Sequence, residues 1–149
     1  MKYFSILLIF IPAIMANSCK CTKKTEKTKS ATISQQIIKK VIIDKNFDFN
    51  NYKNDFAIKN TTIADSTLSI TFAYTGCTDD ELDIVFNGNY VKTFPPKASL
   101  NLIKKSSGKD CEKQVEKTLL FNISPIRYPS AKTLVILFPN YEQKLMYNY

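Results

Sequence analysis

From residue 56 onward the chain alternates hydrophobic and polar residues with a period of two, which is the pattern of β-strands with one buried face. Residues 68–74 show this alternation most clearly, and further runs lie at 56–63, 82–86, 90–94, 100–102, 119–123, 134–138 and 141–147. The run 134–138 is hydrophobic on both faces, which predicts a central strand. Seven or eight short strands predict an all-β fold, either a small barrel or an antiparallel β-sandwich, and we favour the sandwich.

The segments between these runs carry turn signals. Asn87-Gly88 predicts a tight hairpin turn, because both residues tolerate positive φ. Pro95-Pro96 is expected to end a strand. Residues 44–54 are rich in Asn and Asp and predict a loop that aromatic side chains hold in place. Residues 34–43 fit either a helical face or an extended segment ending in a strand, and we favour the second.

The first residues predict export. Lys2 precedes an apolar run of about a dozen residues, too short to span a bilayer comfortably. Small residues and then Cys19 follow, and this arrangement resembles a bacterial lipoprotein signal. We therefore expect residues 1–18 to be a lipoprotein signal peptide and Cys19 to be lipidated. The alternatives are simple signal-peptide cleavage and an uncleaved anchor.

Charge separates a tether from a domain. The net charge is +8, and removing Lys2 together with the five lysines and one glutamate of residues 20–29 leaves +3 for residues 31–149. Residues 19–33 therefore predict a flexible, Lys-rich tether, and residues 34–149 the β domain. The weak charge of the domain argues against nucleic-acid binding. The stretch after Cys19 is basic, whereas some surface-exported lipoproteins have acidic residues there, so we expect an outer-membrane lipoprotein facing the periplasm, with surface exposure as the alternative.

The composition argues against an enzyme and predicts no cofactor. The chain has no His, the commonest general base and zinc ligand. The acidic cluster of Asp79, Asp80, Glu81 and Asp83 matches no calcium-binding loop. Paired carboxylates could serve a glycosidase, but so small a sandwich has little room for a sugar cleft. We therefore interpret the cluster as a solvated turn and strand face.

Lys104 or Lys105 with Ser106 or Ser107 could form a catalytic Ser–Lys dyad. We favour an ordinary turn for this stretch, because turns commonly contain Ser.

The chain has four cysteines, and in an exported protein cysteines commonly pair as disulfides, so the question is which of them are joined. With Cys19 lipidated, Cys77 and Cys111 lie in the domain and Cys21 lies in the tether. We expect a Cys77–Cys111 bond, and two buried thiols are the alternative. The pairing of Cys21 stays open.

Seven short motifs carry a resemblance to a known family. They are Gly76-Cys77, Leu82-Asp83-Ile84, Pro95-Pro96, Leu100-Asn101-Leu102, Gly108-Lys109-Asp110-Cys111-Glu112, Leu120-Phe121-Asn122-Ile123-Ser124 and Tyr147-Asn148-Tyr149. Together they resemble small, uncharacterised lipoproteins of Bacteroidota, with NigD-like proteins as the nearest named neighbours. The resemblance implies a β domain with the same cysteine bridge and no known activity.

This sequence departs from the family at two positions. Members often have a His three residues after the first Cys and another at the end of the Leu-x-Leu strand, where this chain has Asp80 and Lys104. We expect these two residues to form an ion pair in place of the histidines.

Taken together, the export signal, the composition and the predicted β domain indicate a lipid-anchored envelope module with a protein partner and a binding or structural role. A small periplasmic inhibitor or protective protein is the alternative, and a hydrolase is less favoured.

Overall fold

The structure is a computed structural model, and it describes residues 37–52, 55–105 and 108–149. They belong to the second of two units into which the chain divides, Ile33–Tyr149. The elements of this unit, in chain order, are β1 (Ile38–Lys40), β2 (Ile42–Ile43), β3 (Ala57–Ala64), β4 (Thr67–Gly76), β5 (Glu81–Val91), β6 (Lys97–Lys105), β7 (Lys113–Asn122), the short 3₁₀ helix η1 (Ser124–Ile126), β8 (Thr133–Phe138) and β9 (Tyr141–Asn148). No helix among the described residues is long and apolar enough to cross a membrane.

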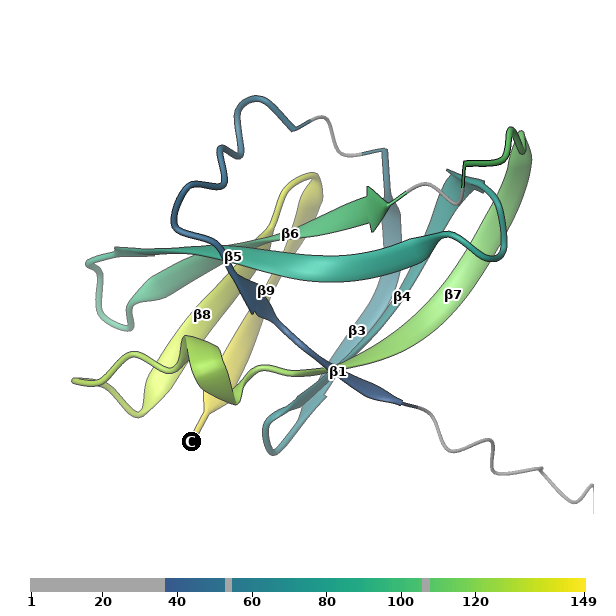
Figure 1. Cartoon of the computed structure of the whole chain (residues 1–149). Helices are drawn as coiled ribbons and strands as arrows, with labels where there is room; N and C mark the ends of the chain where they lie inside the picture. The colour runs from purple at the N-terminus through teal and green to yellow at the C-terminus, as the bar shows by residue number, and fades with distance from the viewer. Residues whose placement is uncertain (1–36, 53–54, 106–107) are drawn as a thin grey trace, which may run out of the picture. The chain divides into compact units, whose positions relative to one another are not determined.

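The strands form two sheets that pack face to face (Figure 1). One sheet has the order β1-β7-β4-β3, and the other has the order β2-β5-β6-β8-β9. The all-β sandwich predicted from the alternation is therefore confirmed. The described residues form nine strands where seven or eight were expected, because the N-terminal segment contributes two short ones.

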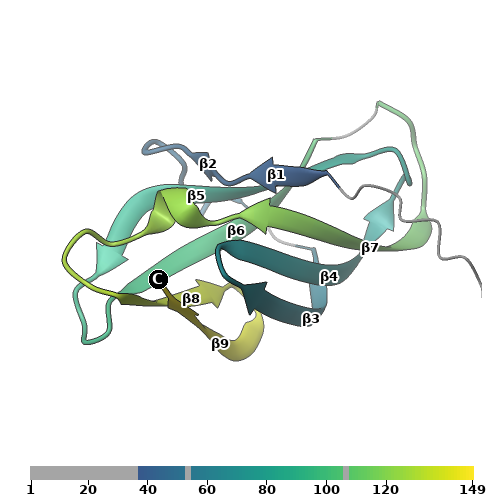
Figure 2. The same cartoon turned by 90° about the horizontal axis from the view of Figure 1, so that it is seen from below.

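The expectation of purely antiparallel sheets is wrong. Three strand pairs are parallel, namely β1 with β7, β2 with β5, and β6 with β8. The first two arise at the N-terminal segment, which pairs with β7 and then moves across to β5 (Figure 2). The third arises because the chain leaves β7, passes through η1 and a loop, and returns beside the start of β6.

The segment that was ambiguous between helix and strand is extended from Ile38 to Ile43, as we favoured. Val41, at the point where the chain changes sheets, is buried. The backbone N–H of Val41 donates to Asn122 O at 3.4 Å on one side, and Asp44 N donates to Phe86 O at 3.0 Å on the other. The segment therefore closes one edge of both sheets.

The core lies between the sheets and is built by the alternating strands. Leu68, Ile70 and Phe72 of β4 are fully buried, as the period-two pattern predicts. The expectation for β8 is also confirmed, since β8 lies between β6 and β9 and its outward-facing Val135 is only 5% exposed. On the far side, the two edge strands are joined by a hydrogen bond between Thr61 Oγ1 and Tyr141 Oη at 3.0 Å.

Asn87-Gly88 is not the predicted hairpin turn. Gly88 does have a positive φ of 79°, but β5 continues through it to Val91, and the pairing with β6 shifts register between Phe86 and Tyr90. The same conformational freedom that permits a turn here permits a β-bulge. The chain reverses instead at residues 92–96, which include a cis Phe94–Pro95 peptide bond.

The Asn- and Asp-rich segment after β2 is a loop, as predicted. The Phe47 ring lies 5.3 Å from that of Phe49 and 5.7 Å from that of Tyr52. The Tyr52 hydroxyl also accepts a hydrogen bond from Lys104 N at 2.9 Å, which attaches the loop to β6. The aromatic residues therefore hold the loop in place, as expected.

Candidate functional site

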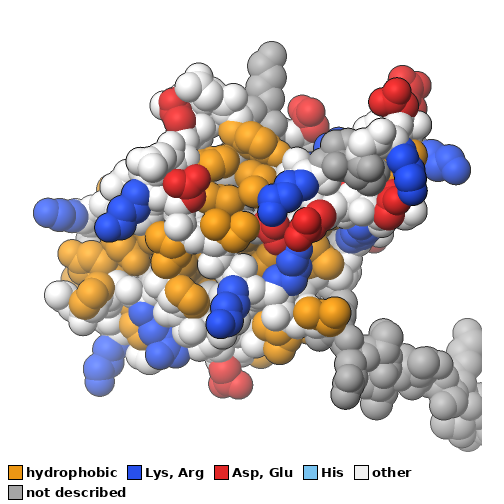
Figure 3. Space-filling view, viewed as in Figure 1, with side chains coloured by type: hydrophobic (Ala, Val, Ile, Leu, Met, Phe, Trp, Pro, Cys, Tyr) orange, Lys and Arg blue, Asp and Glu red, His pale blue; other side chains and the backbone are white. Residues whose placement is uncertain are grey.

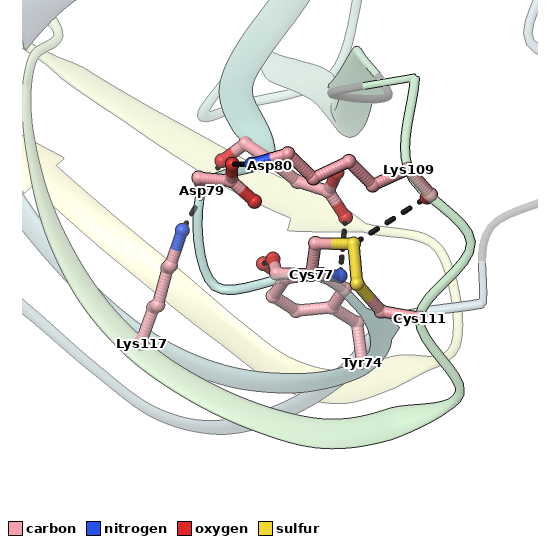
Figure 4. Close-up of polar contacts among 7 residues, drawn as sticks. All are labelled: Tyr74, Cys77, Asp79, Asp80, Lys109, Cys111 and Lys117. Carbon is pink, nitrogen blue, oxygen red and sulfur yellow. Dashed lines mark hydrogen bonds and ion pairs between the residues drawn. A yellow bond between two sulfur atoms is a disulfide. The ribbon is translucent and has the colours of Figure 1, made fainter.

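The predicted disulfide joins Cys77 to Cys111, with the two Cα atoms 5.1 Å apart (Figure 4). Gly76 and Lys113 form the last pair of the β4–β7 ladder, and the two cysteines lie just beyond that pair. The bond therefore continues the connection between these strands past the point where their backbone pairing ends.

Around this disulfide, the turn from β4 to β5 is held by a compact set of hydrogen bonds. The backbone N–H of Cys77 donates to Asp80 Oδ2 at 2.9 Å, and Asp80 N donates to Cys77 O at 3.2 Å. The Tyr74 hydroxyl donates to the same Cys77 carbonyl at 2.7 Å. A Cβ on Gly76 would lie 2.5 Å from Asp80 Oδ2 and 2.9 Å from the Tyr74 ring, so only glycine fits there.

Two lysines approach this turn from neighbouring strands. Lys117 Nζ donates to Asp80 O at 3.1 Å and lies 5.9 Å from the centre of the Tyr74 ring (Figure 4). Lys104 Nζ donates to Thr75 O at 3.1 Å and lies 5.7 Å from the same ring. Asp80 and Lys104 are therefore both near Tyr74, and the ion pair between them stays a prediction.

The electrostatics of the turn are consistent with a structural role. Burial raises the pKa of Tyr74 above its usual value, and the negative charges of Asp80 and Asp79 add to the effect. At the surface, Lys109 Nζ lies 2.6 Å from Asp79 Oδ2, and this hydrogen bond raises the pKa of the lysine. Both shifts leave the ordinary protonation states in place at neutral pH.

The acidic cluster is not the solvated face we expected. Asp80 and Asp83 are buried, at 6% and 5% exposure, whereas Glu81 is exposed. Asp83 forms ion pairs with Lys39 Nζ at 2.5 Å and with Lys105 Nζ at 3.4 Å. Lys39 comes from β1 in the opposite sheet, a long-range contact that the strand pattern did not reveal. Within the described part of the chain, no group of three or more Cys, Asp or Glu could hold a metal ion.

The last residues of the chain form a packed cluster in which Tyr147 is buried and Tyr149 is half-buried. Tyr147 is fully buried, and its hydroxyl accepts a hydrogen bond from Arg127 Nε at 2.9 Å. The guanidinium group of Arg127 lies 5.1 Å from the centre of the Tyr149 ring. The Tyr149 hydroxyl accepts from Tyr128 N at 2.8 Å, so the end of the chain is attached to the loop before β8.

A groove of about 670 Å³ opens at the end of the sandwich where β5 turns into β6. Its lining comes from the β5–β6 loop, the loop before β8, and the outer face of β9, and it consists of Phe94, Pro95, Pro96, Pro129, Ser130, Ala131, Lys132, Thr133 and Met146. We call this set of residues the proline groove. Phe94 is 102% exposed and Met146 is 53% exposed. Figure 3 shows hydrophobic side chains gathered on the left, over this end of the molecule.

A second hydrophobic surface follows the N-terminal strands. Ile37, Ile38, Ile42 and Ile43 are 83%, 52%, 37% and 47% exposed. We call residues 37–43 the β1–β2 edge. Lys39 reaches inward to Asp83 and Val41 is buried, whereas the isoleucine pairs before and after them face solvent.

Several predicted sites fall outside the described residues. Cys19, Cys21, the signal peptide 1–18 and the tether to residue 33 are among them, as are Ser106 and Ser107. The sequence alone supports these predictions.

Comparison with known proteins adds a shared fold. No family model and no curated protein matches the chain. A solved structure from Bacteroides vulgatus, described as a protein of unknown function, DUF1344, aligns with a TM-score of 0.51 and 19% identity over 76% of this chain. The chain spans 57% of the length of that protein. The likeness establishes a common fold and no activity.

A second solved structure is a putative toxin-related protein from Parabacteroides distasonis, at a TM-score of 0.46 and 19% identity. The alignment covers 75% of this chain and 60% of that one. A likeness at this level carries no conclusion about this chain.

Proposed function

We propose that this chain is a lipid-anchored, non-enzymatic binding module of the bacterial cell envelope, with the lipid on Cys19 and a protein partner on the β1–β2 edge. Support for the anchor comes from Lys2, the short apolar run and the small residues before Cys19. We further propose kinship with the NigD-like lipoproteins. The seven sequence motifs that carry the resemblance support this kinship.

One observation carries the proposal of a protein partner, namely the exposed isoleucines of the β1–β2 edge. Four large aliphatic side chains lie within seven consecutive residues, all more than one-third exposed. Contiguous apolar surface of this kind marks interaction sites in soluble domains. The residues also lie on edge strands of both sheets, where a partner strand can add by backbone pairing.

The polar side chains support recognition over catalysis. Among the described residues the buried carboxylates are Asp80, which is engaged at the disulfide turn, and Asp83, which is engaged with Lys39. The proline groove has one titratable side chain, Lys132, and no carboxylate. General acid–base chemistry needs a positioned proton donor or acceptor of suitable pKa, and this groove offers no pair of such groups.

The test is affinity capture of the tagged full chain from its native envelope after mild crosslinking, read by mass spectrometry. We expect one partner that Ile38→Lys removes and Val91→Lys retains. The control makes the same change at a residue that is 54% exposed but lies away from the edge. Equal capture by both variants would rule out the edge as the binding surface. One dominant, stoichiometric partner would establish a binding role or an inhibitory role.

The anchor is tested in the same cells. Cys19→Ala is expected to move the protein from the membrane fraction to the soluble fraction, because the thiol that carries the lipid is gone. Retention in the membrane fraction would instead indicate an uncleaved apolar anchor.

A further inference from the structure

We propose that the proline groove is a binding site for an amphipathic carboxylate, that is, an aliphatic chain ending in a single carboxylate such as a fatty acid. The inference is independent of the protein partner proposed for the β1–β2 edge, which lies on other strands.

The size and lining of the groove fit a small apolar ligand. Its volume of about 670 Å³ lies within the range of roughly 300–1,000 Å³ that is typical of small-molecule sites. Pro96 is buried at the floor, while Phe94 and Met146 are exposed on the walls. Proline rings give the groove fixed walls, and the flexible thioether of Met146 adapts to the shape of an alkyl chain.

The backbone of the groove argues against a peptide. Pro95, Pro96 and Pro129 have no N–H to donate. The N–H of Ala131 is already bonded to Tyr128 O at 3.2 Å, and Pro96 O already accepts from Val135 N at 2.9 Å. A peptide lying here would leave amide groups of its own poorly paired, which is unfavourable, whereas an alkyl chain has no such groups.

The charge around the groove selects an anion. The lining contains one lysine, Lys132, and no Asp or Glu, and two further lysines, Lys92 and Lys97, flank the segment that carries Phe94, Pro95 and Pro96. Ser130, which has a hydroxyl group, is also part of the lining. The nearest acid along β9 is Glu142, four residues from Met146 and so roughly 13 Å away at the usual rise of a strand.

These features define the bound arrangement. The aliphatic chain lies between Phe94 and Met146 over Pro96, and the carboxylate lies at the Lys132 ammonium, where the Ser130 hydroxyl is also available to donate. One lysine and one hydroxyl fit a monoanionic head group, and the exposed rim keeps that group partly in water.

The test is calorimetric titration of the chain with decanoate below its micelle-forming concentration, and with decanol as the uncharged ligand of equal chain length. Lys132→Gln is compared with Lys59→Gln, which removes the same charge from an exposed position on β3. Phe94→Ser and Met146→Ser remove one wall each, and both side chains are exposed, so folding is expected to be retained.

We expect decanoate to bind at one site per chain. Lys132→Gln should weaken decanoate about twofold to fivefold and leave decanol unchanged, since an exposed ion pair contributes at most about 1 kcal/mol, which is about fivefold in affinity. Lys59→Gln should change neither. Phe94→Ser and Met146→Ser should each weaken both ligands. Added salt should weaken decanoate only.

Three results would overturn the proposal. The first is an absence of saturable decanoate binding by the unaltered chain. The second is equal affinity for decanoate in Lys132→Gln and Lys59→Gln, which would show that Lys132 does not bind the carboxylate. The third is loss of protein capture in Phe94→Ser without any decanoate binding, which would assign the groove to a protein partner.

Discussion

Gly76→Ala adds a methyl group where the turn from β4 to β5 has no space for one. The new Cβ would lie 2.5 Å from Asp80 Oδ2 and 2.9 Å from the Tyr74 ring. Neither neighbour moves freely, because Asp80 accepts from Cys77 N and the Tyr74 hydroxyl donates to Cys77 O. The substitution must therefore displace at least one side chain that holds the turn.

Two costs follow. Overpacking a filled site typically destabilises by about 1–3 kcal/mol. Separating the Asp80 carboxylate from the buried Cys77 N–H leaves that donor unpaired, at a cost of about 1–3 kcal/mol. If the Asp80 carboxylate moves away, the overpacking is relieved but the hydrogen bond to Cys77 N is lost. The two costs therefore do not add in full, and we expect Gly76→Ala to lower the free energy of unfolding by about 3 kcal/mol.

The assay is equilibrium urea unfolding of the chain from residue 20 onward, with the disulfide intact, followed by circular dichroism. Asp80→Ala removes the closer obstacle, so the double variant should lose less stability than the two single variants added together, by about 1 kcal/mol. Gly108→Ala is the control, because φ is +79° there and a Cβ would meet nothing within 4 Å. The losses in stability caused by Gly108→Ala and Asp80→Ala should therefore be additive. If the losses caused by Gly76→Ala and Asp80→Ala were additive as well, the steric account would be refuted.

Three further predictions concern the same domain. Cys77→Ser/Cys111→Ser opens a loop of 34 residues and should cost about 3–4 kcal/mol by the chain-entropy model, measured by urea unfolding; a loss below 1 kcal/mol would contradict it. Asp80→Ala and Lys104→Ala should be non-additive in stability if the two side chains form an ion pair, and additive losses would remove the pair. Burial, followed by the neighbouring Tyr149 and Tyr128, raises the pKa of Tyr90, so its contribution to stability is complete below pH 10.0 and is lost as the pH rises through the folded-state pKa. Tyr90→Phe should flatten this alkaline decline, and an unchanged slope would argue against the shift.

The sequence was most informative where local patterning decides the structure. The alternation along residues 68–74 predicted both the strand and its buried face, and the count of cysteines predicted the bond between Cys77 and Cys111. Local signals were ambiguous where one residue type serves two conformations. Asn87-Gly88 permits positive φ in a turn and in a bulge alike, and only pairing with β6 decides between them.

Long-range contacts account for what the sequence did not reveal. Asp83 is buried because Lys39 approaches from the other sheet, and Tyr147 is buried because Arg127 and the loop before β8 cover it. The proline groove combines residues from three separate segments, up to 52 positions apart in the sequence between Phe94 and Met146. Its signal in the sequence was limited to Pro95-Pro96 and the long stretches without acidic residues.

The most direct test of a protein partner is site-specific photocrosslinking in cells that make the full chain. A photoreactive amino acid replaces Ile38 on the β1–β2 edge, and in a parallel strain it replaces the exposed Glu116 of β7. The proposed function predicts one discrete crosslinked envelope protein from position 38 and none from position 116. Equal background from both positions would contradict it.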